Sequence, residues 1–207
     1  MPSHHPLGGL CPRHRLGWRR NPSGGHRHRH FHRGGPQMSP RARPDPVQVV
    51  KQRRDAALTA LVDGVPYIRF LGIQFDRRGD ELTAIMPFDE KLIGNPILPA
   101  LHGGATAAFL EVTAIIGLSW NLLWSEIESG AFDAEALAGG QMPRLPRTVD
   151  FTVDYLRSGL PRDAYARARV TRAGRRYGSV HVEAWQDNRD RPFAQAQGHF
   201  VMPRKDG

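Results

Sequence analysis

The sequence predicts an α+β domain in which one curved antiparallel sheet wraps around a single long central helix. Residues 103–124 form a long apolar run that contains a single ionisable side chain. A helix that is apolar nearly all round needs cover on every side. Strand-like segments precede and follow the run, so the predicted order is a helix, two strands, the long helix and four strands. The sheet provides most of the cover, and a partner subunit could provide the rest.

The elements before the long helix follow from periodicity and turn residues. Residues 47–64 show helical apolar spacing and predict a helix that ends at Gly64. Tyr67–Asp76 and Glu81–Phe88 are predicted strands on either side of the turn RRGD. Leu92–Ala100, which contains two prolines, is a predicted loop. The apolar positions of the first helix are Val50, Ala57, Leu58 and Leu61.

The elements after the long helix are mostly strands. Residues 125–145 read as a surface loop or a short helix. Residues 147–156 alternate strictly and predict a strand with one apolar face. Residues 164–171 and 177–185 form a predicted hairpin, and residues 193–202 complete the set. The apolar face of the first of these strands consists of Val149, Phe151, Val153 and Tyr155.

The strong positive charge belongs to the N-terminal tail. Residues 1–45 hold nine Arg and one Asp, whereas the rest of the chain holds 20 basic and 19 acidic residues. Composition predicts a disordered tail over 1–45 and a folded domain over 46–207. Three interpretations of the tail compete: a nucleic-acid-binding arm, a transit peptide, and an upstream mis-start with Met38 as the true first residue. The third is favoured, and no nucleic-acid binding is expected of the folded domain.

Cysteine content and hydropathy argue against several kinds of site and of protein. Cys11 is the only cysteine, so an intramolecular disulfide and a cysteine-based zinc site are excluded. No secretory signal is recognisable. The apolar run is long enough to span a bilayer, but Glu111 near its centre would cost about 2.5–3.5 kcal/mol there. A buried core helix is therefore predicted, with no membrane partner, and a cytoplasmic location is expected.

The start of the long helix is a candidate oxyanion site. His102, Gly103 and Gly104 open the helix, where unpaired N–H groups lie at the positive end of the helix dipole. Glycine lets a ligand approach the backbone closely, so both glycines are candidate substrate contacts. Gly103 is the candidate donor to the oxyanion of an attacked thioester. The alternative is that the two glycines only allow tight packing.

Glu111 is the candidate base or nucleophile. It is the only ionisable side chain between His102 and Glu126. Burial disfavours a charged carboxylate, so such a group is seldom kept for stability alone. It could activate water or form an anhydride. The alternative is a structural Glu that is hydrogen-bonded to backbone or to a partner chain.

Other catalytic arrangements have less support. His102 could act as a base, but ordering the loop or the helix start is the favoured interpretation. Outside the tail only His181 and His199 remain, and no spacing suggests a metal site. No GxSxG motif is present, which argues against a serine hydrolase.

The segments LHGGATAAFLEVTA and RTVDFTVDYLRSG resemble the PaaI-like branch of the hotdog thioesterases, over residues 67–202. The resemblance implies a hotdog fold, assembly as a dimer or tetramer, and hydrolysis of acyl-CoA thioesters without a cofactor. It implies that Gly103 donates to the oxyanion and that Glu111 is the base or nucleophile. Asn95 and Thr148 would position water or the thioester. Many PaaI-like members have Asp at the position of Glu111, so its role as base or nucleophile stays open.

Binding of CoA would involve phosphates, which Arg side chains bind well. Arg157, Arg175 and Arg176 lie near predicted strand ends, where the family places the nucleotide, although ordinary surface charge is the alternative. Two other functions stay open: a non-catalytic acyl-CoA sensor and a hotdog hydratase or dehydratase. The tail shows no helix-turn-helix for a sensor, and the HFPxxPxxPG-type hydratase signature is absent. Release of free thiol would separate enzyme from sensor.

Helix geometry predicts a site shared between two chains. Gly103 and Glu111 are eight residues apart, which is about 12 Å along a helix axis. Oxyanion donor and base must both lie near one reacting group. Two such helices packed antiparallel about a two-fold axis would bring Gly103 of one chain opposite Glu111 of the other.

Overall fold

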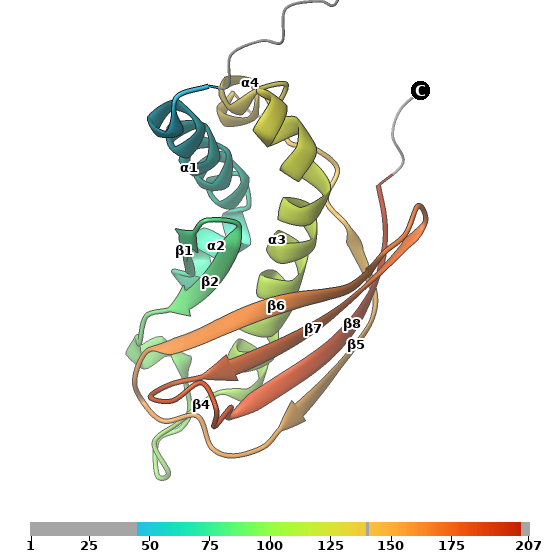
Figure 1. Ribbon diagram of the computed structural model, residues 1–207. Helices are drawn as coiled ribbons and strands as arrows, with labels where there is room; N and C mark the ends of the chain where they lie inside the picture. The colour runs from blue at the N-terminus through green and yellow to red at the C-terminus, as the bar shows by residue number, and fades with distance from the viewer. Residues whose placement is uncertain (1–44, 140, 204–207) are drawn as a thin grey trace, which may run out of the picture. The chain divides into compact units, whose positions relative to one another are not determined.

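The computed structural model describes residues 45–139 and 141–203, and it has the predicted α+β architecture (Figure 1). All neighbouring strands of the main sheet are antiparallel. In spatial order they are β1 (Gln74–Arg78), β2 (Glu81–Met86), β6 (Ala164–Ala173), β7 (Tyr177–Trp185), β8 (Ala194–Val201) and β5 (Arg147–Tyr155). The predictions for residues 1–44 lie outside the described residues.

Four helices and a small hairpin complete the part of the domain that the structure describes. The helices are α1 (Val47–Asp63), α2 (Pro66–Leu71), α3 (Gly103–Ser129) and α4 (Ala134–Ala138). A short 3-10 turn, η1 (Glu90–Leu92), precedes the two-stranded hairpin of β3 (Ile93–Asn95) and β4 (Ala100–Leu101). The segment predicted as a loop before α3 therefore contains a hairpin.

α3 is the central helix, and the sheet curves around it (Figure 1). It is long and apolar enough to cross a membrane by length and composition, but 56% of its most apolar window is buried inside the domain. Gly130 ends it in the left-handed conformation, with φ of 76°. At Gly117 helix and sheet approach closely, because a Cβ there would lie 2.7 Å from the Ala168 Cβ. The prediction of a sheet wrapped around a long buried helix is confirmed.

The alternation predicted for β5 is interrupted by a β-bulge. Thr148 lies opposite Phe200 and Asp150 opposite His199, so Val149 is the extra residue of the bulge. Thr148 therefore shares the inner face with Phe151, whereas Val149 is 62% exposed. The prediction that Val149 belongs to the apolar face was wrong, because one extra residue shifts the phase of the strand.

The first predicted strand begins with a helix instead. Pro66 occupies the first turn of α2, and Gly72 ends the helix with φ of 71°. Proline at a helix start and a left-handed glycine after its end are the usual boundaries of a helix. The β-forming residues between them are therefore helical, and the strand starts only at Gln74.

The first helix was predicted correctly, and it packs against the C-terminal part of α3. α1 ends before Gly64, and its buried side chains are Ala57, Leu58, Ala60 and Leu61. Arg54 binds both carboxylate oxygens of Glu128, at 2.7 and 2.8 Å. The contact is possible because α3 continues to Ser129, five residues beyond the predicted apolar run.

Candidate active site

The start of α3 presents a free backbone donor. Gly103 is the first helical residue, and within the described residues its N–H has no hydrogen-bond acceptor. The next N–H, of Gly104, donates to Nδ1 of His102 at 2.9 Å. His102 therefore caps the helix, and the uncharged ring carries its proton on Nε2. Since the Gly104 donor is already occupied, Gly103 is the better placed of the two glycines to meet an oxyanion.

The carbonyl of Gly103 has a partner that the sequence analysis did not identify. The hydroxyl of Tyr155 donates to Gly103 O at 2.8 Å. Tyr155 is the last residue of β5 and was expected only as an apolar face residue. Its conspicuous sequence signal was alternation, which says nothing about the hydroxyl.

Glu111 lies half-buried on α3, where β5 passes the helix. Its Oε1 accepts a hydrogen bond of 2.7 Å from Oγ1 of Thr148. The structure thus brings together two of the predicted site residues. The bond orients the carboxylate and leaves Oε2 available for water or substrate.

Gly103 and Glu111 remain on different turns of one helix. Their separation along the axis is about 12 Å, which is too far for both to act on one carbonyl. A Glu side chain leans toward the helix N-terminus, but it closes only part of this gap. The helix start at Gly103 and the Glu111 carboxylate are therefore two separate candidate half-sites within one chain.

Asn95 shapes the hairpin before α3. Its Oδ1 accepts hydrogen bonds from the N–H groups of Ile97 and Leu98, at 3.0 and 3.3 Å. In this chain its carboxamide oxygen therefore closes the turn between β3 and β4. The hairpin also packs on the helix cap, since a Cβ on Gly94 would come within 2.7 Å of the His102 Cα.

The three candidate arginines do not meet within one chain. Arg157 follows β5 at the end of the sheet where Tyr155 meets Gly103. Arg175 and Arg176 form the turn between β6 and β7 at the opposite end, where Arg176 O accepts from Met202 N. The length of β5 separates the two ends by about 26 Å. All three side chains are exposed.

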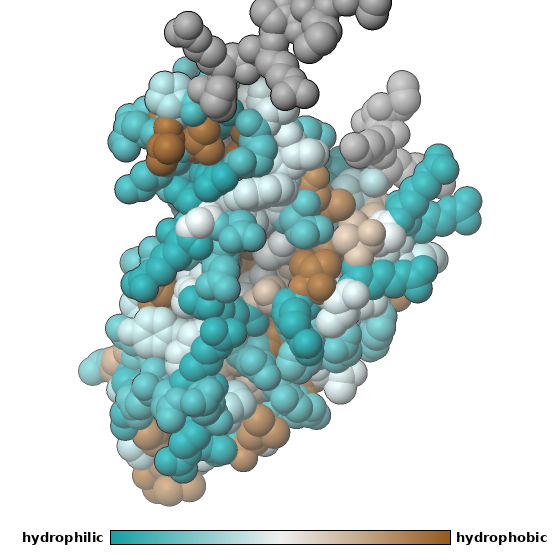
Figure 2. Space-filling model, in the orientation of Figure 1, coloured by the Kyte–Doolittle hydropathy of each residue, from teal (hydrophilic) through white to brown (hydrophobic). Residues whose placement is uncertain are grey.

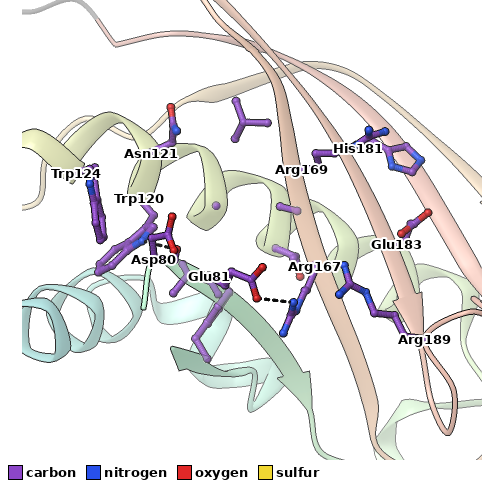
Figure 3. Close-up of a pocket in the computed structure, with 16 residues that line it drawn as sticks. Asp80, Glu81, Trp120, Asn121, Trp124, Arg167, Arg169, His181, Glu183 and Arg189 are labelled. Carbon is purple, nitrogen blue, oxygen red and sulfur yellow. Dashed lines mark hydrogen bonds and ion pairs between the residues drawn. The ribbon is translucent and has the colours of Figure 1, made fainter. Parts of the chain in front are cut away.

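A cavity of about 750 Å³ opens between β2 and β6 (Figure 3). Arg167 lines this cavity and donates to Thr83 Oγ1 and Glu81 Oε2, both at 2.8 Å. α3 contributes Thr113 and Trp120 to the lining. Thr113 is two residues, about 200° of rotation, beyond Glu111 on the helix, so the cavity lies on the far side of α3 from that carboxylate.

Metal chemistry has no preassembled ligand set in residues 45–139 and 141–203. In that part of the chain no group of three or more His, Cys, Asp or Glu side chains could hold a metal ion. The candidate groups that the structure does bring together are the backbone of Gly103, the Glu111 carboxylate and their hydrogen-bond partners.

Comparison with known proteins identifies the family. The sequence profile of the thioesterase superfamily matches residues 98–193, which contain Gly103, Glu111 and Thr148. The solved structure of a protein from Chromobacterium violaceum is 32% identical in sequence, with a TM-score of 0.52, and the match covers 77% of this chain and 99% of that one. The chain belongs to the thioesterase superfamily.

Other superfamily structures share the fold. A protein from Shewanella oneidensis related to the thioesterase superfamily is 25% identical, covers 74% of this chain and 97% of its own, and has a TM-score of 0.55. A phenylacetic acid degradation-related protein from Ralstonia eutropha JMP134 is 18% identical, covers 70% and 99%, and has a TM-score of 0.51. Among curated proteins, none matches.

Membership of the thioesterase superfamily supports a hydrolase with a thioesterase-type function. The fold also agrees with the hotdog architecture that the PaaI-like resemblance implied. The matched segment begins three residues after Asn95, so the profile includes the helix start and Glu111 but not Asn95.

Proposed function

We propose that this thioesterase-superfamily protein hydrolyses acyl-CoA thioesters to a free carboxylic acid and CoA, in the cytoplasm. The observation that carries the proposal is Glu111, a half-buried carboxylate on an apolar helix that accepts a hydrogen bond from Thr148. A carboxylate held in this way suits proton abstraction from water or direct attack on a carbonyl.

The proposed chemistry uses the two half-sites together. The Gly103 N–H receives the thioester carbonyl oxygen as it becomes an oxyanion. On one route Glu111 takes a proton from water as the water adds to the carbonyl carbon; collapse of the oxyanion breaks the C–S bond, and the departing CoA thiolate takes up that proton. On the other route Glu111 itself adds to the carbonyl carbon and the CoA thiolate leaves as the C–S bond breaks; water then cleaves the anhydride, and the proton released goes to the thiolate. Either route gives the same products.

We propose that each complete site is built from two chains. One face of α3 is only partly covered, and apart from Glu111 its residues are apolar. On the face of the molecule shown in Figure 2, apolar residues are scattered among hydrophilic ones. This face consists of Gly104, Ala108, Glu111, Ile115 and Leu122, which recur at helical spacing. A second copy packed antiparallel on this face would cover it and place Gly103 of one chain opposite Glu111 of the other.

The outer strand β5 supports the same assembly. It ends the strand order of the sheet, so one of its edges has no partner strand within the described residues. Pairing of β5 with its copy about a two-fold axis would satisfy that edge. It would also bring Arg157 of one chain to the end of the sheet that carries Arg175 and Arg176 of the other, where the phosphates of CoA could bind.

The test is thiol release from a panel of CoA thioesters with short aliphatic, long aliphatic and aromatic acyl groups. The wild-type chain is expected to release CoA from at least one class, and the preferred class identifies the acyl group. A chain that binds these thioesters without releasing thiol would be a sensor. A chain that hydrates an enoyl-CoA without releasing thiol would be a hydratase.

A further inference from the structure

The peptide group that joins Gly103 to Gly104 is held at both of its ends. Its carbonyl oxygen accepts from the Tyr155 hydroxyl at 2.8 Å. Its N–H donates to Nδ1 of His102 at 2.9 Å. The next group toward the N-terminus is the free N–H of Gly103, the proposed oxyanion donor. The two bonds therefore clamp the peptide directly beside the group that must be oriented.

These two hydrogen bonds are needed because the helix begins with two consecutive glycines. Glycine has the largest backbone freedom of any residue, so a Gly–Gly start would otherwise vary in orientation. Gly104 cannot be replaced without disturbing the cap, because a Cβ there would lie 2.9 Å from the His102 Nδ1. Gly103 is less crowded, since a Cβ added there would lie 3.4 Å from the Tyr155 hydroxyl, which is an ordinary contact.

We propose that Tyr155 is a positioning residue for the thioesterase reaction, acting through the Gly103–Gly104 peptide on the Gly103 N–H. This inference rests on the proposed function. A hydrogen bond to a peptide carbonyl polarises that peptide, so the bond from Tyr155 also strengthens the bond from Gly104 to His102. Preorganised donors stabilise an oxyanion because they need no reorientation during the reaction.

The same strand then supports both half-sites of one chain. Thr148 contacts Glu111 and Tyr155 contacts Gly103, from positions seven residues apart on β5. The bulge at Val149 allows this, because it places Thr148 on the face that also carries Tyr155. In a two-chain assembly, each β5 would thus order groups that belong to two different active sites.

The variant Tyr155→Phe removes the hydroxyl and keeps the ring. Tyr155 is 55% exposed, so the melting temperature should not change. The kcat should fall about three- to tenfold, the range expected for one neutral hydrogen bond, with little change in KM. Tyr177→Phe is the matched control, since Tyr177 is 60% exposed at the first position of β7, and it should behave as wild type.

A double variant tests whether the effect passes through Gly103. Gly103→Pro removes the N–H, and proline is favoured at the first helical position. The His102 backbone, with φ of −63° and ψ of 133°, already suits a following proline. Adding Tyr155→Phe to Gly103→Pro should cause no further loss of kcat. An equal further loss in this background would overturn the proposal.

Amide hydrogen exchange gives a readout that does not need turnover. Exchange of the Gly104 N–H should become faster in Tyr155→Phe and stay unchanged in Tyr177→Phe. Unchanged exchange, or faster exchange with an unchanged kcat, would each contradict the positioning role. If the wild type hydrolysed no CoA thioester, the proposed function would fail, and the exchange rates alone would decide whether Tyr155 orders the helix start.

Discussion

Oγ1 of Thr148 donates a 2.7 Å hydrogen bond to Oε1 of Glu111, and a β-bulge makes this contact possible. Without the extra residue at Val149, strict alternation would place Thr148 on the face opposite Phe151. The bulge returns it to the inner face, against α3. An irregularity of the strand thus orients the carboxylate of the proposed site.

Replacement of Thr148 tests the importance of that bond. Thr148→Val keeps the shape and removes the donor, so the kcat for a CoA thioester should fall about ten- to a hundredfold, the range for a hydrogen bond to a charged group. Thr148→Ser should recover most of the rate. Thr152→Val is the control, because Thr152 is exposed on the same strand. Full activity in Thr148→Val would show that the bond plays no part in turnover.

Replacement of Glu111 tests the proposed base or nucleophile. Glu111→Gln is nearly isosteric and should lower kcat about a hundredfold or more, because amides neither accept a proton nor attack a carbonyl efficiently. The melting temperature and the oligomeric state should be preserved. Glu126→Gln, which changes a partly buried carboxylate on the same helix outside the candidate site, is the control. Near-normal turnover in Glu111→Gln would remove this residue from the mechanism.

The N-terminal tail should be dispensable. A chain that starts at Met38 should have the same melting temperature and the same kcat as the full chain, because the charge and low complexity are confined to residues 1–45. Thermal unfolding and the thiol-release assay provide the comparison. A clear loss of either quantity would assign the tail a structural or functional role.

The ion pair between Arg54 and Glu128 should make stability depend on pH. The hydrogen bond from Arg54 holds the pKa of the Glu128 carboxyl below its ordinary value. The pair therefore stabilises the fold fully at pH values above the ordinary pKa of Glu. This contribution is lost as the pH falls through the lowered pKa of Glu128 in the folded protein. The Glu128 side chain is 34% exposed, so solvent screening limits the contribution to about 0.2–1 kcal/mol.

Glu128→Gln should accordingly unfold at lower denaturant concentration than wild type at neutral pH. The difference in denaturant midpoint between the two chains should shrink in acid, because protonated Glu128 is then uncharged, as Gln is. Glu135→Gln, at an exposed position of α4, should unfold like wild type at both pH values. A difference that grows in acid would contradict the assigned role of the pair.

The fold was predictable where one physical signal dominated. The apolar run of residues 103–124 with Glu111 near its centre predicted a core helix, alternation placed most of β5, and the turns RAGRR and DNRD placed β6, β7 and β8. The α2 segment was misread because its β-forming residues outweighed the boundary signals of Pro66 and Gly72. The bulge at Val149 could not be predicted, because the apolar and polar residues around it alternate regularly in the sequence.

The candidate site was predictable in part. Glu111 stood out as a lone carboxylate in an apolar helix, and Gly103 as the first residue of that helix. Resemblance to the hotdog thioesterases added Asn95 and Thr148. Tyr155 was missed because its role depends on a contact with Gly103, 52 residues away in the chain. The turn-closing bonds of Asn95 likewise depend on local loop geometry that the sequence alone does not reveal.

The shared site is tested most directly by complementation between Glu111→Gln and Gly103→Pro chains. Each variant alone should be nearly inactive, whereas Gly103→Ala, which keeps the N–H, should stay active. Co-folded in equal amounts, the two inactive chains should recover about a quarter of wild-type turnover, since half of the dimers are mixed and each has one intact site. If mixed dimers form, as shown by native mass spectrometry, and no activity returns, each chain must complete its own site.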